Sequence, residues 1–180
     1  RCRVIIFVND KSMRRYPRLF YETAVSCGVE FLNFGSFSFN KYQAYFIRYC
    51  LFRQFLIKNY DKIKRVIFVD LYDTIFQHDP FTIDFGNRLY LTPEDRQFNI
   101  SKLNLVWLMD CVKYFKKFYD PTLSDLFTEK FKKEVLKEPA LNGGLQAGTI
   151  DIMIEYSKSM LKMGNQQTFE VYCNDQGFLN

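Results

Sequence analysis

Two carboxylates follow one apolar segment of the chain at close spacing. Asp70 and Asp73 come directly after the segment 65–69. Carboxylates so close together repel unless a cation, a proton or a basic side chain offsets their charge. Oxygen ligands favour Mg²⁺ or Mn²⁺, which one or two carboxylates hold while substrate phosphates complete the shell. We therefore predict a Mn²⁺ or Mg²⁺ site at Asp70 and Asp73; in the alternative, one Asp caps a turn and the other is solvated.

Two polar segments near the end of the sequence carry groups suited to binding sugars. Asn142 offers a donor and an acceptor to sugar hydroxyls, and the pair Gly143-Gly144 lets the backbone approach a ligand closely. The alternative is a plain loop between a helix and a strand. Asp175-Gln176 could bind hydroxyls bidentately, or it could form an ordinary helix N-cap.

Two arginines interrupt an apolar segment that predicts a buried helix over residues 41–59. A buried cation must meet an anion, because its desolvation is otherwise costly. Arg48 and Arg53 are therefore candidates for contact with an anionic group, unless both side chains extend to water along a tilted helix. The single histidine, His78, is predicted to lie in a turn where Pro80 fixes the backbone and Asp79 bonds locally.

The elements that position these residues alternate between strand and helix. Apolar, β-branched runs predict strands, and helical spacing predicts helices between them, at 3–8, 17–27, 29–35, 41–59 and 65–69. This βαβαβ order favours a parallel sheet covered by helices on both faces. Ligands bind beyond the carboxyl ends of such strands. Asn9 and Asp10 after the first strand and Asp70 and Asp73 after the third are thus expected to share one crevice. Further elements are predicted at 85–91 (strand) and at 102–118, 125–137 and 151–163 (helices).

Composition limits the class of protein. The chain has 180 residues, of which 48% are hydrophobic and 18% aromatic, so we expect one folded domain over 1–180, excised or processed from a longer chain. The longest apolar run, Val4–Val8, is far shorter than the roughly 20 residues of a membrane span. The net charge is +5, but the aromatic residues alternate with aliphatic ones as core residues do, and are not interleaved with the basic residues as in a nucleic-acid binder. Five cysteines without a C-x-x-C pair argue against structural zinc.

Three strings of the sequence resemble one enzyme family. Val69–Phe81 resembles the metal-binding segment of glycosyltransferases with the A-type (GT-A) fold, in particular the nucleotide-diphospho-sugar transferases, whose aspartate motif continues into Phe-Gln-x-Asp-Pro-Phe. Leu141–Gly148 resembles the Asn-x-Gly segment that lines the donor sugar. Asn174–Gln176 resembles the Asp-Gln pair of retaining families such as the glycogenin group. The resemblance extends over the whole chain, although two residues separate its aspartates where the usual motif has one.

The resemblance implies a fold and an activity. The fold would be α/β, a single Rossmann-like GT-A domain with a mainly parallel central sheet and helices on both faces. The activity would be metal-dependent transfer, with retention, of a sugar from a UDP- or GDP-sugar donor to a glycan or glycoprotein acceptor. The secretory or Golgi lumen is the implied location, with any targeting segment outside this chain. No nucleic acid is expected as a partner.

The same resemblance, together with the strand-end argument, assigns site residues. The expected catalytic residues are Asp175, Gln176 and Asn142. The metal ligands are Asp70 and Asp73, with Mn²⁺ or Mg²⁺ as cofactor. The residues expected to bind the donor are Asn9, Asp10, Arg48, Asp70, Asn142, Gly143 and Gly144; Arg48 stands where the family has a basic residue that reaches the aspartate motif or the nucleotide.

Two other functions remain open from the sequence. Phe68–Thr74 also resembles the nucleophile loop of haloacid-dehalogenase-type hydrolases, in which Asp70 would attack the substrate. That loop normally follows the first strand, whereas two predicted strands precede it here. The third possibility is a catalytically inactive domain that binds sugar nucleotides or carbohydrate, because a fold does not by itself imply an activity.

Overall fold

The computed structural model describes residues 2–36, 41–71, 74–97, 100–118, 134 and 136–163. The chain divides into two compact units, Arg1–Asn40 and Lys41–Asn180, and each is described here by itself. The single domain expected over 1–180 and the crevice shared between the first and third strands stay predictions. No helix in the described part of the chain is long and apolar enough to cross a membrane.

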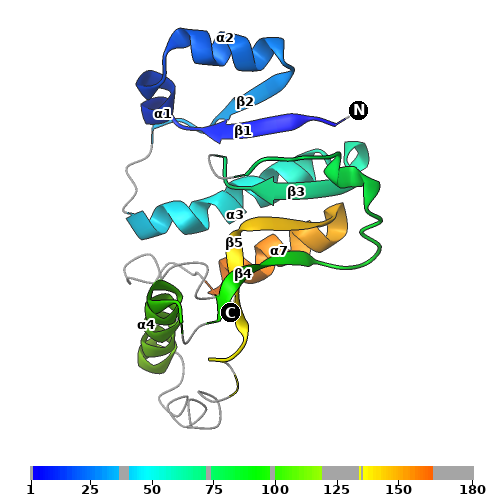
Figure 1. Cartoon of the computed structure of the whole chain (residues 1–180). Helices are drawn as coiled ribbons and strands as arrows, with labels where there is room; N and C mark the ends of the chain where they lie inside the picture. The colour runs from blue at the N-terminus through cyan, green and yellow to red at the C-terminus, as the bar shows by residue number, and fades with distance from the viewer. Residues whose placement is uncertain are drawn as a thin grey trace. The chain divides into compact units, whose positions relative to one another are not determined.

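The first unit is a pair of parallel strands that two helices connect along the chain (Figure 1). Strands β1 (Val4–Val8) and β2 (Val29–Asn33) pair in parallel over their full length. Helices α1 (Asp10–Arg15) and α2 (Arg18–Ser26) form the connection. Both predicted strands and the helix predicted at 17–27 are confirmed, with ends shifted by one or two residues. Gly28, at φ 85°, follows α2 in the left-handed conformation that suits glycine after a helix.

The second unit holds an antiparallel sheet of three strands in the order β3-β5-β4. Figure 1 shows β5 running between β3 and β4. In chain order, the elements are α3 (Lys41–Lys58), η1 (Tyr60–Lys62), β3 (Arg65–Val69), η2 (Pro80–Thr82), β4 (Tyr90–Gln97), α4 (Lys102–Phe118), β5 (Pro139–Thr149) and α7 (Ile150–Met163). The strand predicted at 65–69 and the helices predicted at 41–59, 102–118 and 151–163 are confirmed. The helix predicted at 125–137 lies almost entirely outside the described residues.

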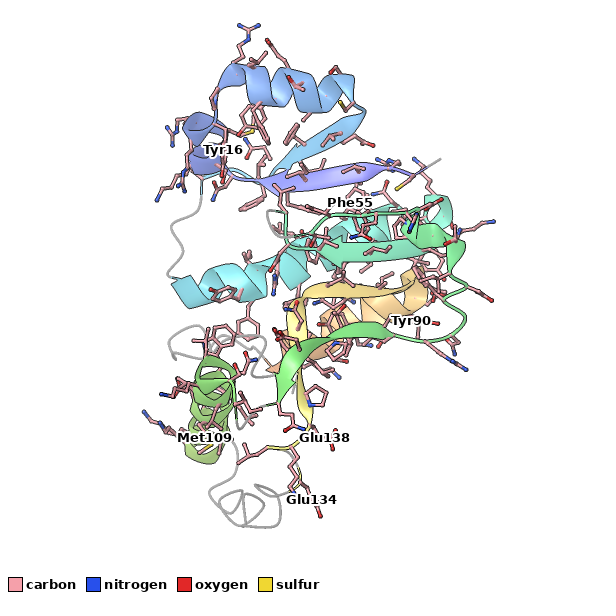
Figure 2. All side chains as sticks on the ribbon, viewed as in Figure 1. Tyr16, Phe55, Tyr90, Met109, Glu134 and Glu138 are labelled. Carbon is pink, nitrogen blue, oxygen red and sulfur yellow. The ribbon has the colours of Figure 1, made fainter. Side chains whose placement is uncertain are left out.

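The core of the second unit lies between helices α3 and α7. The rings of Tyr49 and Tyr156 meet edge to face with centroids 5.7 Å apart, and Phe46 and Met153 are fully buried beside them. Phe55, labelled in Figure 2, packs against the same cluster. Buried positions on α3 recur at helical spacing, and this apolar face holds the helix in place. Arg48 is thereby carried on a rigid, well-packed element.

The sheet differs from the sequence-based prediction. The mixed α/β class is confirmed, but the single, mainly parallel central sheet is wrong: the described strands form a parallel pair and a separate antiparallel sheet. A continuous apolar run indicates a buried strand without specifying the direction of its neighbour. The partner of β3 is β5, which runs antiparallel to it.

Strand β5 itself was not predicted. A plain loop was the alternative interpretation of Asn142-Gly143-Gly144, and no strand was predicted there. In the structure these residues lie inside an eleven-residue strand bonded on both sides. The strand predicted at 85–91 overlaps β4 only at Tyr90 and Leu91. The pairs that flank the two glycines, Thr92 with Asn142 and Val69 with Leu145, hold them in the strand despite their low intrinsic propensity.

Candidate functional site

An ion pair joins helix α3 to the end of strand β3. Arg48 Nη1 donates to Asp70 Oδ1 at 2.9 Å; the side chains are 21% and 51% exposed, respectively. The Arg48 guanidinium also lies 5.4 Å from the centre of the Tyr49 ring. Since Tyr49 is fully buried, this contact packs the guanidinium group against the core. Arg48 therefore pairs with the Asp70 carboxylate instead of extending into bulk water.

The same arginine reaches the glycine segment of β5. Arg48 Nη2 donates to the Gly143 carbonyl at 3.1 Å. The Asp70 backbone N–H donates to the Gly144 carbonyl at 2.8 Å. Two segments far apart in the sequence, the aspartate motif and Asn142–Gly144, are thus brought into direct contact by strand pairing and by one guanidinium group.

The glycine segment forms a bulge in the sheet. Leu91 pairs with Gln146 and the next β4 residue, Thr92, pairs with Asn142, so residues 143–145 of β5 lie between two consecutive pairs. Gln146, 2% exposed, donates from Nε2 to the Gly143 carbonyl at 2.5 Å and so closes the bulge from inside. Bulges of this kind re-aim groups beside functional sites. Here the Gly143 carbonyl of the bulge accepts from Arg48.

Gly144 sits in a notch between two side-chain oxygens. A Cβ added to it would lie 2.8 Å from Asn142 Oδ1 and 2.9 Å from Asp70 Oδ2, closer than real Cβ atoms come. Only glycine fits this place without a shift of its neighbours. The two oxygens therefore flank the position of that added Cβ.

The side chain of Asn142 is bonded at both ends of its amide. Its Oδ1 accepts from the Gly144 N–H at 2.6 Å, and its Nδ2 donates to Glu94 Oε1 at 2.8 Å. Glu94 lies in β4, within a second register shift between Pro93 and Gln97. Glu94 and Gln146 were not among the predicted site residues. The strand predicted at 85–91 ends before Glu94, so no local pattern indicated the cross-strand partner of this residue.

A metal ion at this site would depend on more than the described residues. Among them, no group of three or more His, Cys, Asp or Glu side chains is placed to hold an ion. Asp73, the second expected ligand, lies outside the described residues. The half-exposed Asp70 carboxylate has about four lone-pair sites, so it can bond Arg48 and still contribute to an ion. A carboxylate oxygen is a ligand that Mn²⁺ and Mg²⁺ accept, and the phosphates of a substrate commonly supply further ligands to such ions.

The two candidates in the first unit hold the end of the parallel strand pair. Asn9 is the N-cap of α1, accepting from the Ser12 N–H at 2.7 Å. Asp10, expected in a loop, is the first residue of α1 and accepts from Asn33 Nδ2 at 2.8 Å and from the Ser36 hydroxyl. The hydrogen bond from Ser36 has the larger effect and that from Asn33 the next, and together they hold the pKa of the Asp10 carboxyl below its ordinary value. Both side chains thus have local structural work, and their role toward a donor stays a prediction.

The remaining predicted residues are Asp175, Gln176, Arg53 and His78. Asp175 and Gln176 lie outside the described residues. Arg53 makes no described contact with Asp70 or Gly143, the partners of Arg48. Its buried Nε has no hydrogen-bond partner among the described residues. The turn around His78 is confirmed, since Asp79 accepts from the Phe81 N–H at 2.9 Å and caps η2.

Comparison with known proteins leaves the family resemblance untested. No family model matches the chain, and no curated protein or solved structure matches it either. The geometry around Asp70 and the three motif strings are the observations that bear on function.

Proposed function

We propose that this chain is the catalytic domain of a metal-dependent glycosyltransferase that moves a sugar from a nucleotide-diphosphate donor to a glycan or protein acceptor. One observation carries the proposal: Arg48 contacts both Asp70 and the segment Asn142–Gly144, and Asp70 contacts the same segment. The resemblance implies that Asp70 and the Asn142–Gly144 segment bind one donor molecule, with Arg48 reaching the aspartate motif or the nucleotide. Their contact is what a shared donor site requires.

Each described residue has a distinct part in the proposed site. Arg48, already beside a carboxylate, is suited to bind the donor diphosphate, because a guanidinium matches phosphate oxygens with two parallel N–H groups. Asp70 would hold the ion together with Asp73, and the ion, when bound, would stabilise the charge that develops on the leaving diphosphate. Gly144 leaves room for the donor to approach the backbone.

The sugar end of the donor is assigned to the amide side. Asn142 lies next to Asp70 across Gly144, and we propose that it bonds the hydroxyls of the transferred sugar. Asp175 and Gln176 are proposed on the acceptor side, with retention of configuration. Binding groups and an ion suffice for this chemistry, so the proposal needs no serine, cysteine or histidine nucleophile.

A binding screen tests the proposal directly. Thermal unfolding of the chain is measured with UDP, GDP and their sugars, each with and without Mn²⁺. We expect one nucleotide diphosphate to raise the melting temperature in the presence of Mn²⁺, because a ligand that binds only the folded state stabilises it. Asp70→Asn should abolish that rise, and Asp61→Asn, at an exposed carboxylate in η1, is the matched control.

The alternatives predict different results in the same screen. A hydrolase that uses Asp70 as nucleophile would be stabilised by beryllofluoride or vanadate, which mimic a phosphoryl group, and not by a nucleotide diphosphate. An inactive binding domain would give the nucleotide response and yet transfer no sugar in a product assay with acceptor glycans. No rise with any nucleotide diphosphate would contradict the proposed function.

A further inference from the structure

We propose that Glu94 is a positioning residue that orients the Asn142 amide for recognition of the donor sugar. The inference rests on the proposed function for its substrate, the sugar part of a nucleotide-diphospho-sugar. It rests on the structure for its geometry: Glu94 Oε1 accepts from Asn142 Nδ2 at 2.8 Å across the β4–β5 pair.

The two partners of Asn142 leave its amide a single orientation. The Gly144 N–H can only donate, so it must face the Asn142 oxygen, at 2.6 Å. A carboxylate can only accept, so Glu94 must face the Asn142 nitrogen. A rotation of the amide by 180° would put two donors together at Gly144 and two acceptors together at Glu94. Glu94 and the Gly144 N–H therefore together fix which end of the amide points toward Asp70.

This orientation matters because of what lies beside it. Asn142 Oδ1 and Asp70 Oδ2 flank the same point at Gly144, 2.8 Å and 2.9 Å from it. An amide has two N–H hydrogens and its oxygen two lone pairs, and within the described part of the chain the bonds to Glu94 and Gly144 use one of each. The other hydrogen and the other lone pair are available for neighbouring hydroxyls of a sugar. If the amide turned, the oxygen beside Asp70 would be replaced by a nitrogen.

Glu94 is held in place by the local backbone. It lies in the part of β4 where the register shifts, between the pairs Pro93 with Leu141 and Gln97 with Pro139. The side chain is half-buried, and its bond to Asn142 is part-buried. A charge-assisted hydrogen bond in such a place is stronger than a neutral one in water. Glu94 acts through Asn142 and not on the reacting atoms.

The bond itself is tested without any ligand. In ¹⁵N spectra of the full chain, the Asn142 side-chain NH₂ pair is assigned by its disappearance in Asn142→Asp. We expect Glu94→Ala to move this pair to the range of solvent-exposed amides. Glu94→Gln, which keeps an acceptor oxygen, should restore most of the original position. Asp95→Ala, at the adjacent carboxylate, is the control and should leave the pair unchanged. An unmoved pair in Glu94→Ala would overturn the positioning role.

The substrate part is tested by calorimetry with two probes, a nucleotide diphosphate and the corresponding nucleotide sugar, each with Mn²⁺. We expect Glu94→Ala to weaken nucleotide-sugar affinity about tenfold, as for loss of one hydrogen bond to a charged group, and to leave the bare diphosphate within about twofold. Glu94→Gln should recover the difference. Equal loss for both probes, or no recovery with Gln despite a restored amide signal, would overturn the proposed sugar role.

The two measurements separate this inference from the proposed function. If the unaltered chain binds no nucleotide sugar, the proposed function and the sugar role both fail, while the ligand-free spectra still decide whether Glu94 orients Asn142. If the unaltered chain binds the donor and Glu94→Ala binds it equally well, only the inference about Glu94 fails.

Discussion

Arg48 Nη1 lies 2.9 Å from Asp70 Oδ1, and this pair links the helix core to the strand end at which the site is centred. The pair sits at the surface of the site, with Asp70 half-exposed, so its own contribution to stability is about 1 kcal/mol or less. Its geometry matters more than its energy. It holds a guanidinium and a carboxylate next to the Gly143 carbonyl, where a donor diphosphate and its ion would bind.

The first prediction concerns Arg48→Met. Methionine keeps the apolar packing of α3, and Asp70 remains solvated, so the free energy of unfolding should fall by only about 1 kcal/mol. Donor affinity, measured by calorimetry with a nucleotide diphosphate and Mn²⁺, should fall about tenfold or more because the phosphate loses a charged partner. Arg53→Met on the same helix is the matched control. Unchanged donor affinity in Arg48→Met would leave the arginine with a structural role only.

The second prediction concerns the carboxylates. Asp70→Asn and Asp73→Asn should each abolish Mn²⁺-dependent nucleotide binding, because an amide oxygen is a much weaker ligand for a hard cation than a carboxylate. For Asp70→Asn, the fold should be retained, since that side chain is half-exposed and its backbone bond to Gly144 is unaffected. Electron paramagnetic resonance of Mn²⁺, with and without nucleotide, measures the effect. Metal-dependent affinity equal to that of the unaltered chain would remove the mutated residue from the ligand set.

The third prediction concerns Gly144→Ala. The added Cβ would meet Asn142 Oδ1 at 2.8 Å and Asp70 Oδ2 at 2.9 Å, so both side chains must shift. We expect a loss of stability of about 1–3 kcal/mol in urea unfolding, together with loss of donor binding. Gly86→Ala is the control: it strains a backbone at φ 49° but has open space around the new methyl group. If both variants lost stability yet bound donor alike, the notch at Gly144 would have no part in binding.

The fourth prediction concerns Asp10 and pH. Hydrogen bonds from Ser36 and Asn33 lower the pKa of the Asp10 carboxyl in the folded state. The stability that follows is therefore complete above the unfolded pKa of about 3.9 and is lost as the pH falls through the lower folded value. Carboxyl NMR titration should show the depressed pKa, and Ser36→Ala should raise it toward the ordinary value. A folded pKa at or above about 3.9 would contradict the bonding seen at the end of β1.

The fifth prediction separates sugar binding from diphosphate binding. Asn142→Ala and Asp175→Asn should lower the rate of sugar transfer strongly, while affinity for the bare nucleotide diphosphate stays nearly constant, because groups that act only on the sugar in the transition state affect kcat. Both quantities are measured on the same preparations. Parallel losses of rate and of diphosphate affinity would mean that these residues support the fold and not the sugar.

Local patterns in the sequence were enough to place most elements. The run Arg65–Val69 is a strand with the predicted ends, and α3, α4 and α7 occupy the predicted ranges, because apolar spacing reflects which face of an element is buried. The charge of Arg48 on an apolar helix similarly favoured an anionic partner, with extension of the side chain to water as the alternative. Residue type also indicated that Asp70 and Asn142 were suited to bind ions and hydroxyls.

Tertiary structure decided which of these residues meet. The antiparallel pairing of β3 with β5 brings Asp70 against Gly144, and the two register shifts with β4 bring Glu94 against Asn142. No local pattern specifies strand direction or register, since both depend on pairing between residues distant in the chain. The local pattern at Asn142-Gly143-Gly144 left a plain loop open and did not predict a strand. The contacts that define the candidate site are therefore products of long-range pairing, whereas the elements that carry them follow from local burial and propensity.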